Sequence, residues 1–186
     1  MIKMKLIKLN NDNFFSLWPS IEAFSSKRFP SGESFLKVEA KHYLDTYAKY
    51  RIFLIIDEAH GGEIVSYFVL EAASIFWAID AQYPIPNPCV ELSYFSLNDK
   101  FAMYNGHGLG LGQAIFKKYV METIKYVAQN VGVEHIILFA LPISKVINAY
   151  ENMGFYLMND DIAEYIRYYS VKDCKLMVYN LKKINS

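Results

Sequence analysis

The sequence predicts a single α/β domain, spanning residues 1–186, that is built on a mixed sheet. Short apolar stretches rich in β-branched residues alternate with longer stretches of helical periodicity. A hairpin pattern is centred on Gly61-Gly62, and a glycine-rich stretch at 106–112 directly precedes the longest helical pattern. The length suits one domain, and no repeat, low-complexity tract or linker divides the chain.

The N-terminal half is expected to contain a strand, two helices and the hairpin. Asn10 and Asn13 are typical of a helix start, and Gly61-Gly62 is typical of a tight turn. The expected elements are a strand at 2–9, a short helix at 14–18 that ends or bends near Pro19, a loop at 25–33, a helix at 34–47, and strands at 51–56 and 64–70. Residues 73–88 are interpreted as a long connection that is either the border of a binding site or a simple lid or spacer.

The C-terminal half alternates strands and helices. The helix expected at 113–130 has an apolar face that includes Phe116, Val120 and Ile124, and Gly132 ends it. The other expected elements are strands at 90–97, 135–141, 155–158 and 175–181, a helix at 142–152 ended by Gly154, and an acidic, tyrosine-rich connection at 159–169. Residues 135–141 are almost wholly apolar, which favours a central strand.

Composition limits the function classes. Lys and Arg number 19 and Asp and Glu also number 19, so the formal net charge is zero and nothing in the bulk electrostatics favours nucleic acid or an anionic membrane. The N-terminus alternates charged and apolar residues, and no apolar run reaches the ~20 residues of a membrane span. We therefore expect a cytoplasmic protein, with Cys89 and Cys174 as reduced thiols. The histidines and cysteines show no metal-ligand spacing, so no metal is expected.

The glycine stretch indicates an anion site. Four of the nine glycines fall within 106–112, and the backbone N–H groups of such a loop, at the start of a helix, favour a phosphate. A Walker loop is excluded because Gln113 and Ala114 follow Gly112, leaving no lysine for a γ-phosphate and no hydroxyl for magnesium. A Rossmann fingerprint is disfavoured because its third glycine position would hold Leu111 or Gln113.

Two motifs together resemble the GNAT superfamily of acyl-CoA-dependent N-acetyltransferases. Residues 107–112, His-Gly-Leu-Gly-Leu-Gly, match its pyrophosphate signature Gln/Arg-x-x-Gly-x-Gly/Ala except at the first position. Residues 149–155, Ala-Tyr-Glu-Asn-Met-Gly-Phe, match its second signature throughout, one strand downstream. The resemblance covers roughly residues 51–181 and implies a mixed, mostly antiparallel twisted sheet of about six to seven strands, flanked by about four helices.

The resemblance implies roles for individual residues. The stretch His107, Gly108, Leu109, Gly110, Leu111 and Gly112 would bind the CoA pyrophosphate. Backbone groups of Phe95 and Leu97 would contact the thioester carbonyl and the pantetheine arm. Tyr150 would be the general acid for the leaving thiolate, and Glu91, four residues before Phe95, lies near the position where one branch of the family has its general base.

The sequence departs from the family pattern at three places. His107 replaces the usual Gln or Arg, which puts one phosphate contact in doubt. The loop before His107 is longer than is common, and residues 102–105 are candidates to fold over the cofactor. Ile143 replaces an asparagine that often contacts pantetheine, and the nearby Asn148 is out of register.

The resemblance favours transfer of an acetyl group from acetyl-CoA to a primary amine of a small molecule or protein. Two alternatives stay open, a CoA-binding module without turnover and a toxin-like acetylation of aminoacyl-tRNA, against which the zero net charge counts. The acceptor groove is expected in residues 14–35, 73–88 and 159–169, whose aromatics suggest an apolar or aromatic acceptor. The length of the acyl group, a homodimer, and the choice between Glu91 and a water chain as base also stay open.

Overall fold

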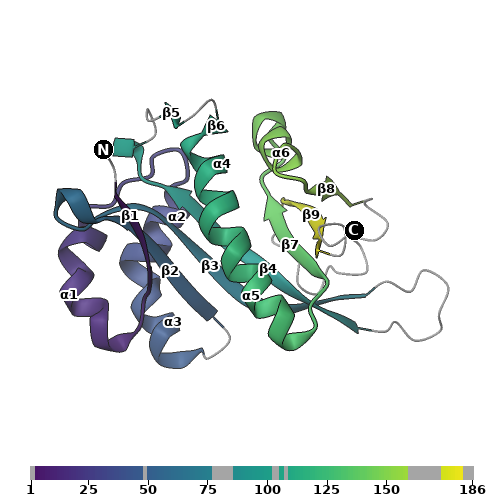
Figure 1. Cartoon of the computed structure of the whole chain (residues 1–186), viewed down its shortest axis with the longest axis horizontal. Helices are drawn as coiled ribbons and strands as arrows, with labels where there is room; N and C mark the ends of the chain where they lie inside the picture. Colours follow the sequence, from purple (N-terminus) through teal and green to yellow (C-terminus); the bar gives the residue numbers. More distant parts are fainter. Residues whose placement is uncertain are drawn as a thin grey trace. The chain divides into compact units, whose positions relative to one another are not determined.

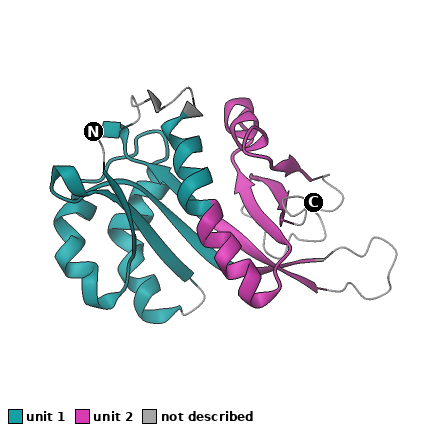
Figure 2. Ribbon diagram, in the orientation of Figure 1, with its two compact units in different colours: residues 1–71, 93–120 teal, residues 72–92, 121–186 magenta. Residues whose placement is uncertain are grey.

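The computed structural model describes residues 3–47, 50–76, 86–101, 105–106, 109–158 and 173–181. The chain divides into two compact units (Figure 2). The first unit consists of Met1–Glu71 and Ser93–Val120, and the second of Ala72–Leu92 and Met121–Ser186. Both draw on the long strands β3 (Glu63–Phe76) and β4 (Pro86–Leu97).

Seven of the described strands pair in the order β1-β2-β3-β4-β7-β9-β8. The remaining strands of this sheet are β1 (Met4–Lys8), β2 (Tyr50–Asp57), β7 (His135–Ala140), β8 (Tyr156–Leu157) and β9 (Lys175–Asn180), and the short strands β5 (Asn105–Gly106) and β6 (Leu109–Gly110) pair separately. The β4–β7 pair is parallel, while β1–β2, β2–β3, β7–β9 and β8–β9 are antiparallel. The predicted mixed, mostly antiparallel sheet is confirmed.

The predicted hairpin is formed by β2 and β3. A short 3₁₀ helix, Glu58–His60, leads into Gly61 and Gly62, whose φ angles of 71° and 78° favour glycine. The predicted connection at 73–88 is wrong at both ends, because β3 runs to Phe76 and β4 begins at Pro86. The residues between them, 77–85, lie outside the described part of the chain.

Helix α1 (Asn11–Glu22) is longer at both ends than the helix predicted at 14–18, although an asparagine caps its start as expected. The Asn10 side chain accepts a hydrogen bond from the Asn13 N–H at 3.0 Å, and the Asn13 side chain accepts one from the Asn10 N–H at 2.8 Å. The predicted end near Pro19 is wrong. Pro19 has no N–H to donate to the carbonyl of Phe15, but Phe15 is 73% exposed, so solvent can satisfy that carbonyl.

The second helix begins at Pro30 instead of Ser34. Helix α2 (Pro30–Ser34), a π-helical turn (Phe35–Glu39) and α3 (Ala40–Thr46) follow one another directly. Proline suits the first helical position because the N–H it lacks would have no partner there. In the π turn the Ala40 N–H donates to the Phe35 carbonyl, so that two residues five positions apart both have fully buried side chains.

The core of the first unit is formed by side chains of α1, the π turn and α3 together with those of β2 and β3. Figure 1 shows the purple and blue helices beside these strands. The core is continuous from Leu9 and Phe14 to Tyr67 and Val69. Trp18 and Tyr43 are partly buried against it, while Tyr47 is 42% exposed. Phe24, by contrast, is fully buried.

The long helix after the glycine stretch begins at Leu111, two residues earlier than expected. It consists of α4 (Leu111–Ile115), a π-helical turn (Phe116–Val120) and α5 (Met121–Val131), and Gly132 follows with φ 69°. Its buried residues are Leu111, Ile115, Phe116, Tyr119, Val120, Met121 and Ile124, close to the predicted face. The Tyr119 hydroxyl donates to the Met4 carbonyl at 3.1 Å and attaches this helix to β1.

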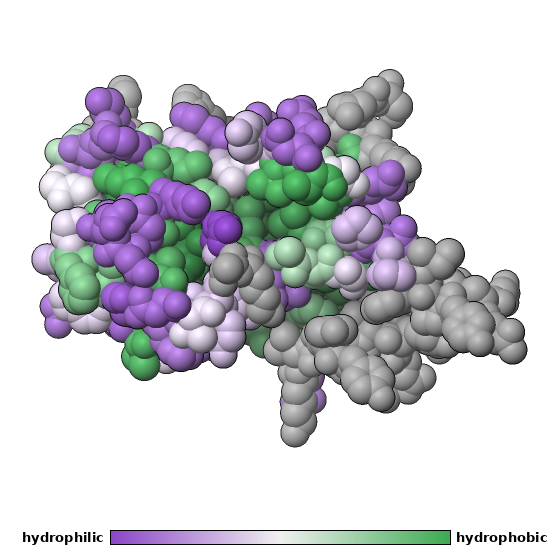
Figure 3. Space-filling view, turned by 90° about the horizontal axis from the view of Figure 1, so that it is seen from below, coloured by the Kyte–Doolittle hydropathy of each residue, from purple (hydrophilic) through white to green (hydrophobic). Residues whose placement is uncertain are grey.

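The second unit has its own apolar cluster, in which side chains of β7, β9 and β4 meet Ile75 and Met158. Helix α6 (Ser144–Glu151) follows β7, and β8 and β9 pair as neighbours. Cys89 is buried and Cys174 half-buried, and both are unpaired thiols. No helix among the described residues is long and apolar enough to cross a membrane. Figure 3 shows one face of the chain, where apolar areas alternate with hydrophilic side chains.

Candidate functional site

The first part of the candidate site is the start of α4, in the first unit. Gly110 is the N-cap, with φ −54° and ψ 147°, and no side chain caps the first turn. The N–H groups at the start of a helix have no partner within the helix, and they carry about half a unit of positive charge from the helix dipole. This turn can therefore bind an anion through its backbone.

Neither Gly110 nor Gly112 is required by the fold. Neither has a positive φ, and a Cβ atom built on either of them meets no described atom within 4 Å. Gly154 is different, because its φ is 100° and a Cβ there would lie 2.7 Å from the Tyr179 ring. A glycine that neither dihedral angles nor neighbouring atoms require is expected where a ligand approaches the backbone.

The second part is the C-terminal end of β4, also in the first unit. The Asn98 N–H donates to the Val65 carbonyl of β3 at 2.9 Å, so by strand alternation the N–H groups of Phe95 and Leu97 point to the opposite side of β4. On that side β4 pairs with β7 only from Cys89 to Glu91 in the described chain. The backbone of Phe95 and Leu97 therefore lies beyond the paired part of the strand. The Phe95 ring lies 6.1 Å from the Phe116 ring, which connects this segment to the π-helical turn that follows α4.

Buried polar groups fix the end of β4. The Ser66 hydroxyl donates to the Ser96 carbonyl at 2.7 Å, and the Ser96 hydroxyl donates to the Ser26 hydroxyl at 2.8 Å. The Asn98 side chain donates to the Ile64 carbonyl and accepts from the Lys100 N–H. The sequence analysis did not single out these residues. The available signal was the polar residues Ser96 and Asn98 on either side of Leu97, where the strand ends.

An aromatic stack lies on the face of β4 that Tyr94 shares with Ser96. The rings of Tyr94 and Phe35 are stacked with centroids 4.2 Å apart, and Phe29 lies 6.2 Å from Tyr94. The Tyr67 hydroxyl donates to the Gly32 carbonyl at 2.5 Å. A Cβ on Gly32 would lie 2.4 Å from the Phe29 ring, so this glycine is what allows Phe29 to pack against α2. Within residues 14–35, where an acceptor groove was predicted, Phe29 and Phe35 thus share one cluster with β4.

The third part is the Tyr150 motif, in the second unit. The Tyr150 carbonyl accepts hydrogen bonds from the N–H groups of Met153 at 3.0 Å and Phe155 at 3.1 Å. Phe155 is 3% exposed, and its ring lies 5.8 Å from that of Tyr150 and 5.4 Å from that of Tyr179. The Gly-Phe pair of the motif therefore has a structural role, since it closes the end of α6 and holds the Tyr150 ring.

The Tyr150 hydroxyl is a protonated donor. Burial raises the pKa of Tyr150 to about 12, because an ionised phenolate would lose hydration there. The residue as a whole is half-buried, so the hydroxyl is removed from water without being sealed in. It makes no hydrogen bond to any other part of the chain that the structure describes. A neutral O–H with no other acceptor can donate a proton to a leaving group.

Glu91 also belongs to the second unit. It is half-buried on β4, where it pairs with Ile137 of β7. Burial raises the pKa of the Cys89 thiol to about 12, and the negative charge of Glu91 raises it further in the same direction. Cys89 is therefore an inert, protonated thiol.

The structure describes only some of the remaining predicted residues. His107 and Gly108 lie outside the described residues, as does the side chain of Leu109. The side chain of Leu111 is 7% exposed in the core, so only its backbone can face a ligand. Ile143, which replaces the family's asparagine, is the N-cap of α6, is 53% exposed and provides no side-chain cap. No group of three His, Cys, Asp or Glu residues suited to a metal occurs in the described ranges.

No protein-family model and no curated protein matches the sequence. Solved structures do match. The fold is similar to a crystal structure of a bacterial toxin, with a TM-score of 0.75 and 17% identity, covering 100% of this chain and 94% of that one. It is also similar to a tyrosine-to-phenylalanine mutant of the AtaT toxin (TM-score 0.70, 14% identity, 98% and 92% covered) and to one of KacT (0.70, 15%, 98% and 98%).

AtaTR has been solved with acetyl-CoA, and AtaT with acetyl-methionyl-tRNA. The expectation that nucleic acid is an improbable partner finds no support in these neighbours. It rested on net charge, which averages the whole surface and says nothing of a local site. The identities are low, and what the comparisons establish is the fold. The chain has the fold of the GNAT acetyltransferases, which the order of its elements and its two motifs predicted.

Proposed function

We propose that this protein is an N-acetyltransferase that moves the acetyl group of acetyl-CoA to a primary amine. The observation that carries the proposal is the pair Gly110 and Gly112, which neither backbone angles nor packing requires, at an uncapped helix start. A ligand that contacts the backbone accounts for both. The backbone N–H groups at this helix start suit the CoA pyrophosphate, since a diphosphate accepts several N–H hydrogen bonds at once.

In the proposed complex the amides of residues 108–112 bind the pyrophosphate, with His107 as a further contact. The backbone of Leu97 contacts the pantetheine arm. The N–H of Phe95, beyond the paired part of β4, donates to the thioester carbonyl oxygen. As that oxygen becomes an anion in the transition state, a fixed N–H donor stabilises it more than it stabilises the ground state.

The reaction we propose is direct transfer. The lone pair of the neutral amine attacks the thioester carbon and forms a tetrahedral intermediate, whose collapse breaks the C–S bond. The electron pair of that bond leaves on sulfur, and the Tyr150 hydroxyl gives its proton to the thiolate. The amine nitrogen loses one proton to Glu91 or to water. The products are the amide and free CoA thiol.

The base required depends on the acceptor. A lysine-like amine, with a pKa of about 10.4, costs roughly 4–5 kcal/mol to present neutral at pH 7. An α-amino group, with a pKa of about 7.7–8.0, costs only about 1 kcal/mol. Glu91 is therefore needed most for a lysine-like acceptor, and a water chain suffices for an α-amine.

A second candidate is narrower, namely acetylation of the α-amine of an aminoacyl-tRNA. The specific observation in its favour is the AtaT structure with acetyl-methionyl-tRNA, together with the toxin identity of the other neighbours. The lower cost of neutralising an α-amine also supports it. Both reactions would take place where acetyl-CoA and amines are available, and we assign the protein to the cytoplasm. We retain residues 1–186 as one domain because β3 and β4 contribute to both units.

The test follows free thiol while the protein is mixed with acetyl-CoA and a panel of acceptors. The panel contains polyamines, a lysine-containing peptide, an amino-acid amide and aminoacyl-tRNA. Thiol release with one acceptor class, and its loss in Tyr150→Phe, is the expected result. Binding of acetyl-CoA without thiol release from any acceptor would instead favour the non-catalytic CoA-binding module.

A further inference from the structure

We infer that the loop Ser25 to Phe29 binds the phosphates of an RNA 3′ strand through Lys27 and Arg28, and so recognises the acceptor. This inference rests on the second candidate function, an aminoacyl-tRNA acceptor. It adds the residues that would distinguish an RNA-linked amine from a small free amine. All the groups involved belong to the first unit.

The loop is rigid because its backbone is hydrogen bonded on both sides. The Ser26 N–H donates to Glu33 Oε2 at 2.7 Å, and the Phe29 N–H donates to the Ser26 carbonyl at 2.9 Å. The Asp99 N–H donates to the Ser25 carbonyl at 2.8 Å. These bonds fix the loop without using the Lys27 or Arg28 side chain.

The loop is attached to the end of β4 itself. The Ser96 hydroxyl donates to the Ser26 hydroxyl at 2.8 Å, and both side chains are buried. Ser96 lies between Phe95 and Leu97, the two residues whose backbone groups we assign to the thioester and the pantetheine arm. The loop is therefore held at a fixed position relative to the backbone of Phe95 and Leu97, within the first unit. A phosphate bound there would set the position of the amine attached to it.

Neighbouring acids leave the two cations available. Asp99 Oδ2 accepts from the Lys27 N–H at 2.7 Å, and Glu33 accepts from the Ser26 N–H and from Lys37 at 2.7 Å. The hydrogen bond from Lys37, followed by that from the Ser26 N–H, lowers the pKa of Glu33, which keeps it ionised and bonded. Lys27 and Arg28 are exposed and form no ion pair in the parts of the chain that the structure describes. Two adjacent cations on a rigid loop match consecutive phosphates.

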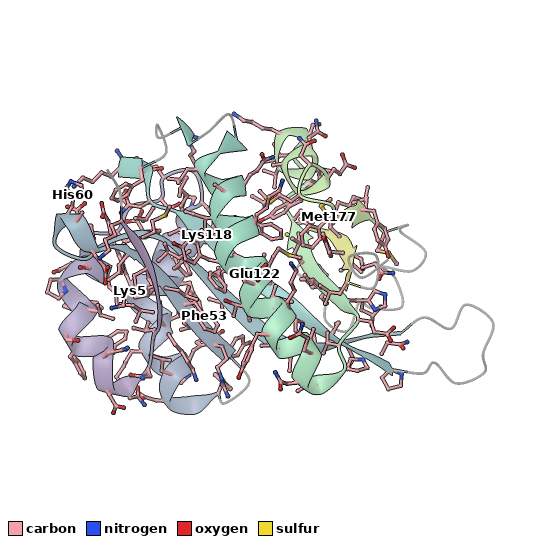
Figure 4. All side chains as sticks on the ribbon, viewed as in Figure 1. Lys5, Phe53, His60, Lys118, Glu122 and Met177 are labelled. Carbon is pink, nitrogen blue, oxygen red and sulfur yellow. The ribbon has the colours of Figure 1, made fainter. Side chains whose placement is uncertain are left out.

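The first unit contains a second exposed pair of adjacent basic residues, Lys117 and Lys118. Lys118 lies on the outer side of the π turn between α4 and α5, and Lys5 lies on β1 (Figure 4). Lys3 and Lys5 share a single acid, Glu58, at 3.1 Å each. Lysines on an edge strand such as β1 are expected, because they prevent pairing with another chain. Phe116, directly before this pair, contacts the Phe95 ring of β4 at 6.1 Å, whereas the Lys27–Arg28 loop is joined to β4 by the buried Ser26–Ser96 hydrogen bond. The pair serves as the matched control.

The experiment compares Lys27→Ala/Arg28→Ala with Lys117→Ala/Lys118→Ala. For the first, we expect the affinity for aminoacyl-tRNA to fall about tenfold near 0.15 M salt, and the slope of log K against log salt to become less steep by about 1.4. The KM for aminoacyl-tRNA rises and its kcat/KM falls, while kcat/KM for an amino-acid amide, which has no phosphate, stays unchanged. The acetyl-CoA affinity of both variants stays at the wild-type value.

Each other outcome has a definite meaning. Equal loss in both variants would overturn the inference in favour of general electrostatic attraction, and weaker acetyl-CoA binding would assign the loop to CoA phosphates instead. A wild-type protein that acetylates free amines but neither binds nor acetylates aminoacyl-tRNA overturns the loop inference and leaves the N-acetyltransferase proposal intact. If the double variant unfolds, Arg28→Ala alone provides the same comparison, with a slope change of about 0.7.

Discussion

At the scale of single residues, Tyr150 decides whether the proposed acid step takes place. Substitution Tyr150→Phe removes the O–H and keeps the ring that packs on Phe155. We expect kcat to fall by about 10²–10⁴-fold while acetyl-CoA affinity and the melting temperature stay nearly unchanged. Because burial raises the pKa of Tyr150 to about 12, the hydroxyl is protonated throughout the physiological range.

The pH dependence provides a second measurement on the same variant. The ratio of wild-type to Tyr150→Phe turnover is expected to stay constant between about pH 6 and about pH 10, because the proton on the phenol is lost only above that range. A ratio that declines towards one as the pH rises to about 10 would show that Tyr150 has an ordinary pKa. Equal turnover of the two proteins would eliminate the acid role.

Two glycines allow a direct comparison of a ligand site with a structural position. Gly110→Ala is expected to change the free energy of unfolding by less than about 0.5 kcal/mol, because its φ suits alanine and its Cβ meets nothing. Gly154→Ala is expected to cost about 1–3 kcal/mol, because of its positive φ and the Tyr179 ring. Denaturant unfolding measures both.

Acetyl-CoA binding by calorimetry should show the opposite order. Gly110→Ala weakens binding and Gly110→Glu abolishes it, while folded Gly154→Ala protein retains it. Normal binding by Gly110→Glu would refute the assignment of the anion site.

At the scale of elements, the π turn at Phe35–Glu39 sets which residues of the second helix face the core. It allows Phe35 to stack on Tyr94 while Ala40, five residues later, is also fully buried. Deletion of Val38, which is 73% exposed, removes one residue from this turn without removing a core side chain. One half of the helix must then rotate by about 100° relative to the other.

The expected cost of deleting Val38 is about 2–5 kcal/mol, comparable to the loss of a large core side chain. The control Val38→Ala keeps the turn and should change stability by less than about 0.5 kcal/mol. Thermal and denaturant unfolding distinguish the two variants. Equal stability of both would mean that the helix adapts and the turn has no such role.

The turn between β2 and β3 depends on a buried carboxylate. Asp57 is 0% exposed, Oδ1 accepts from the N–H groups of Lys3 and Ala59 at 3.0 Å each, and Oδ2 bonds His60 at 2.5 Å. Figure 4 labels His60 at this turn. Desolvation raises the pKa of Asp57, but the hydrogen bonds from His60, Lys3 and Ala59 outweigh it, and the net pKa is lowered.

A carboxyl group with a lowered pKa stabilises the fold fully above its unfolded pKa of about 3.9, and this contribution is lost as the pH falls through the folded value. We expect Asp57→Asn to lose about 1–3 kcal/mol at neutral pH. The difference in unfolding free energy between the variant and the wild type should shrink below about pH 4. A difference that is the same at neutral and acidic pH would contradict this role of the charge.

At the scale of the whole molecule, ligand binding should stabilise the fold. A ligand that binds only the folded chain adds about 2.7 kcal/mol at a concentration 100 times its Kd. We therefore expect acetyl-CoA to raise the melting temperature of the wild type in a concentration-dependent way, and to leave that of Gly110→Glu unchanged. An equal rise in both proteins would place the ligand elsewhere.

Much of this fold could be predicted from local pattern. The hairpin, the long helix and the strand at β7 were recognised because periodicity and turn residues act over a few positions. The two motifs predicted the GNAT fold because Tyr150, Gly154 and Phe155 form one local unit with its own hydrogen bonds. Element ends were less predictable. Helix α1 continues past Pro19 because the carbonyl left without a donor is exposed to solvent. Helix α2 begins at Pro30 because proline is favoured at the first position of a helix.

By itself, the sequence determined the order of elements, the glycine-rich helix start and the identity of the candidate acid, because each depends on residues close together in the chain. Only the tertiary structure decided that the fold requires glycine at position 154 but not at position 110. It alone also showed the hydrogen bond between Ser26 and Ser96, which are seventy positions apart in the chain. It also decided that burial raises the pKa of the Tyr150 hydroxyl to about 12. Steric room, long-range hydrogen bonds and desolvation depend on which distant residues meet, and no local pattern encodes them.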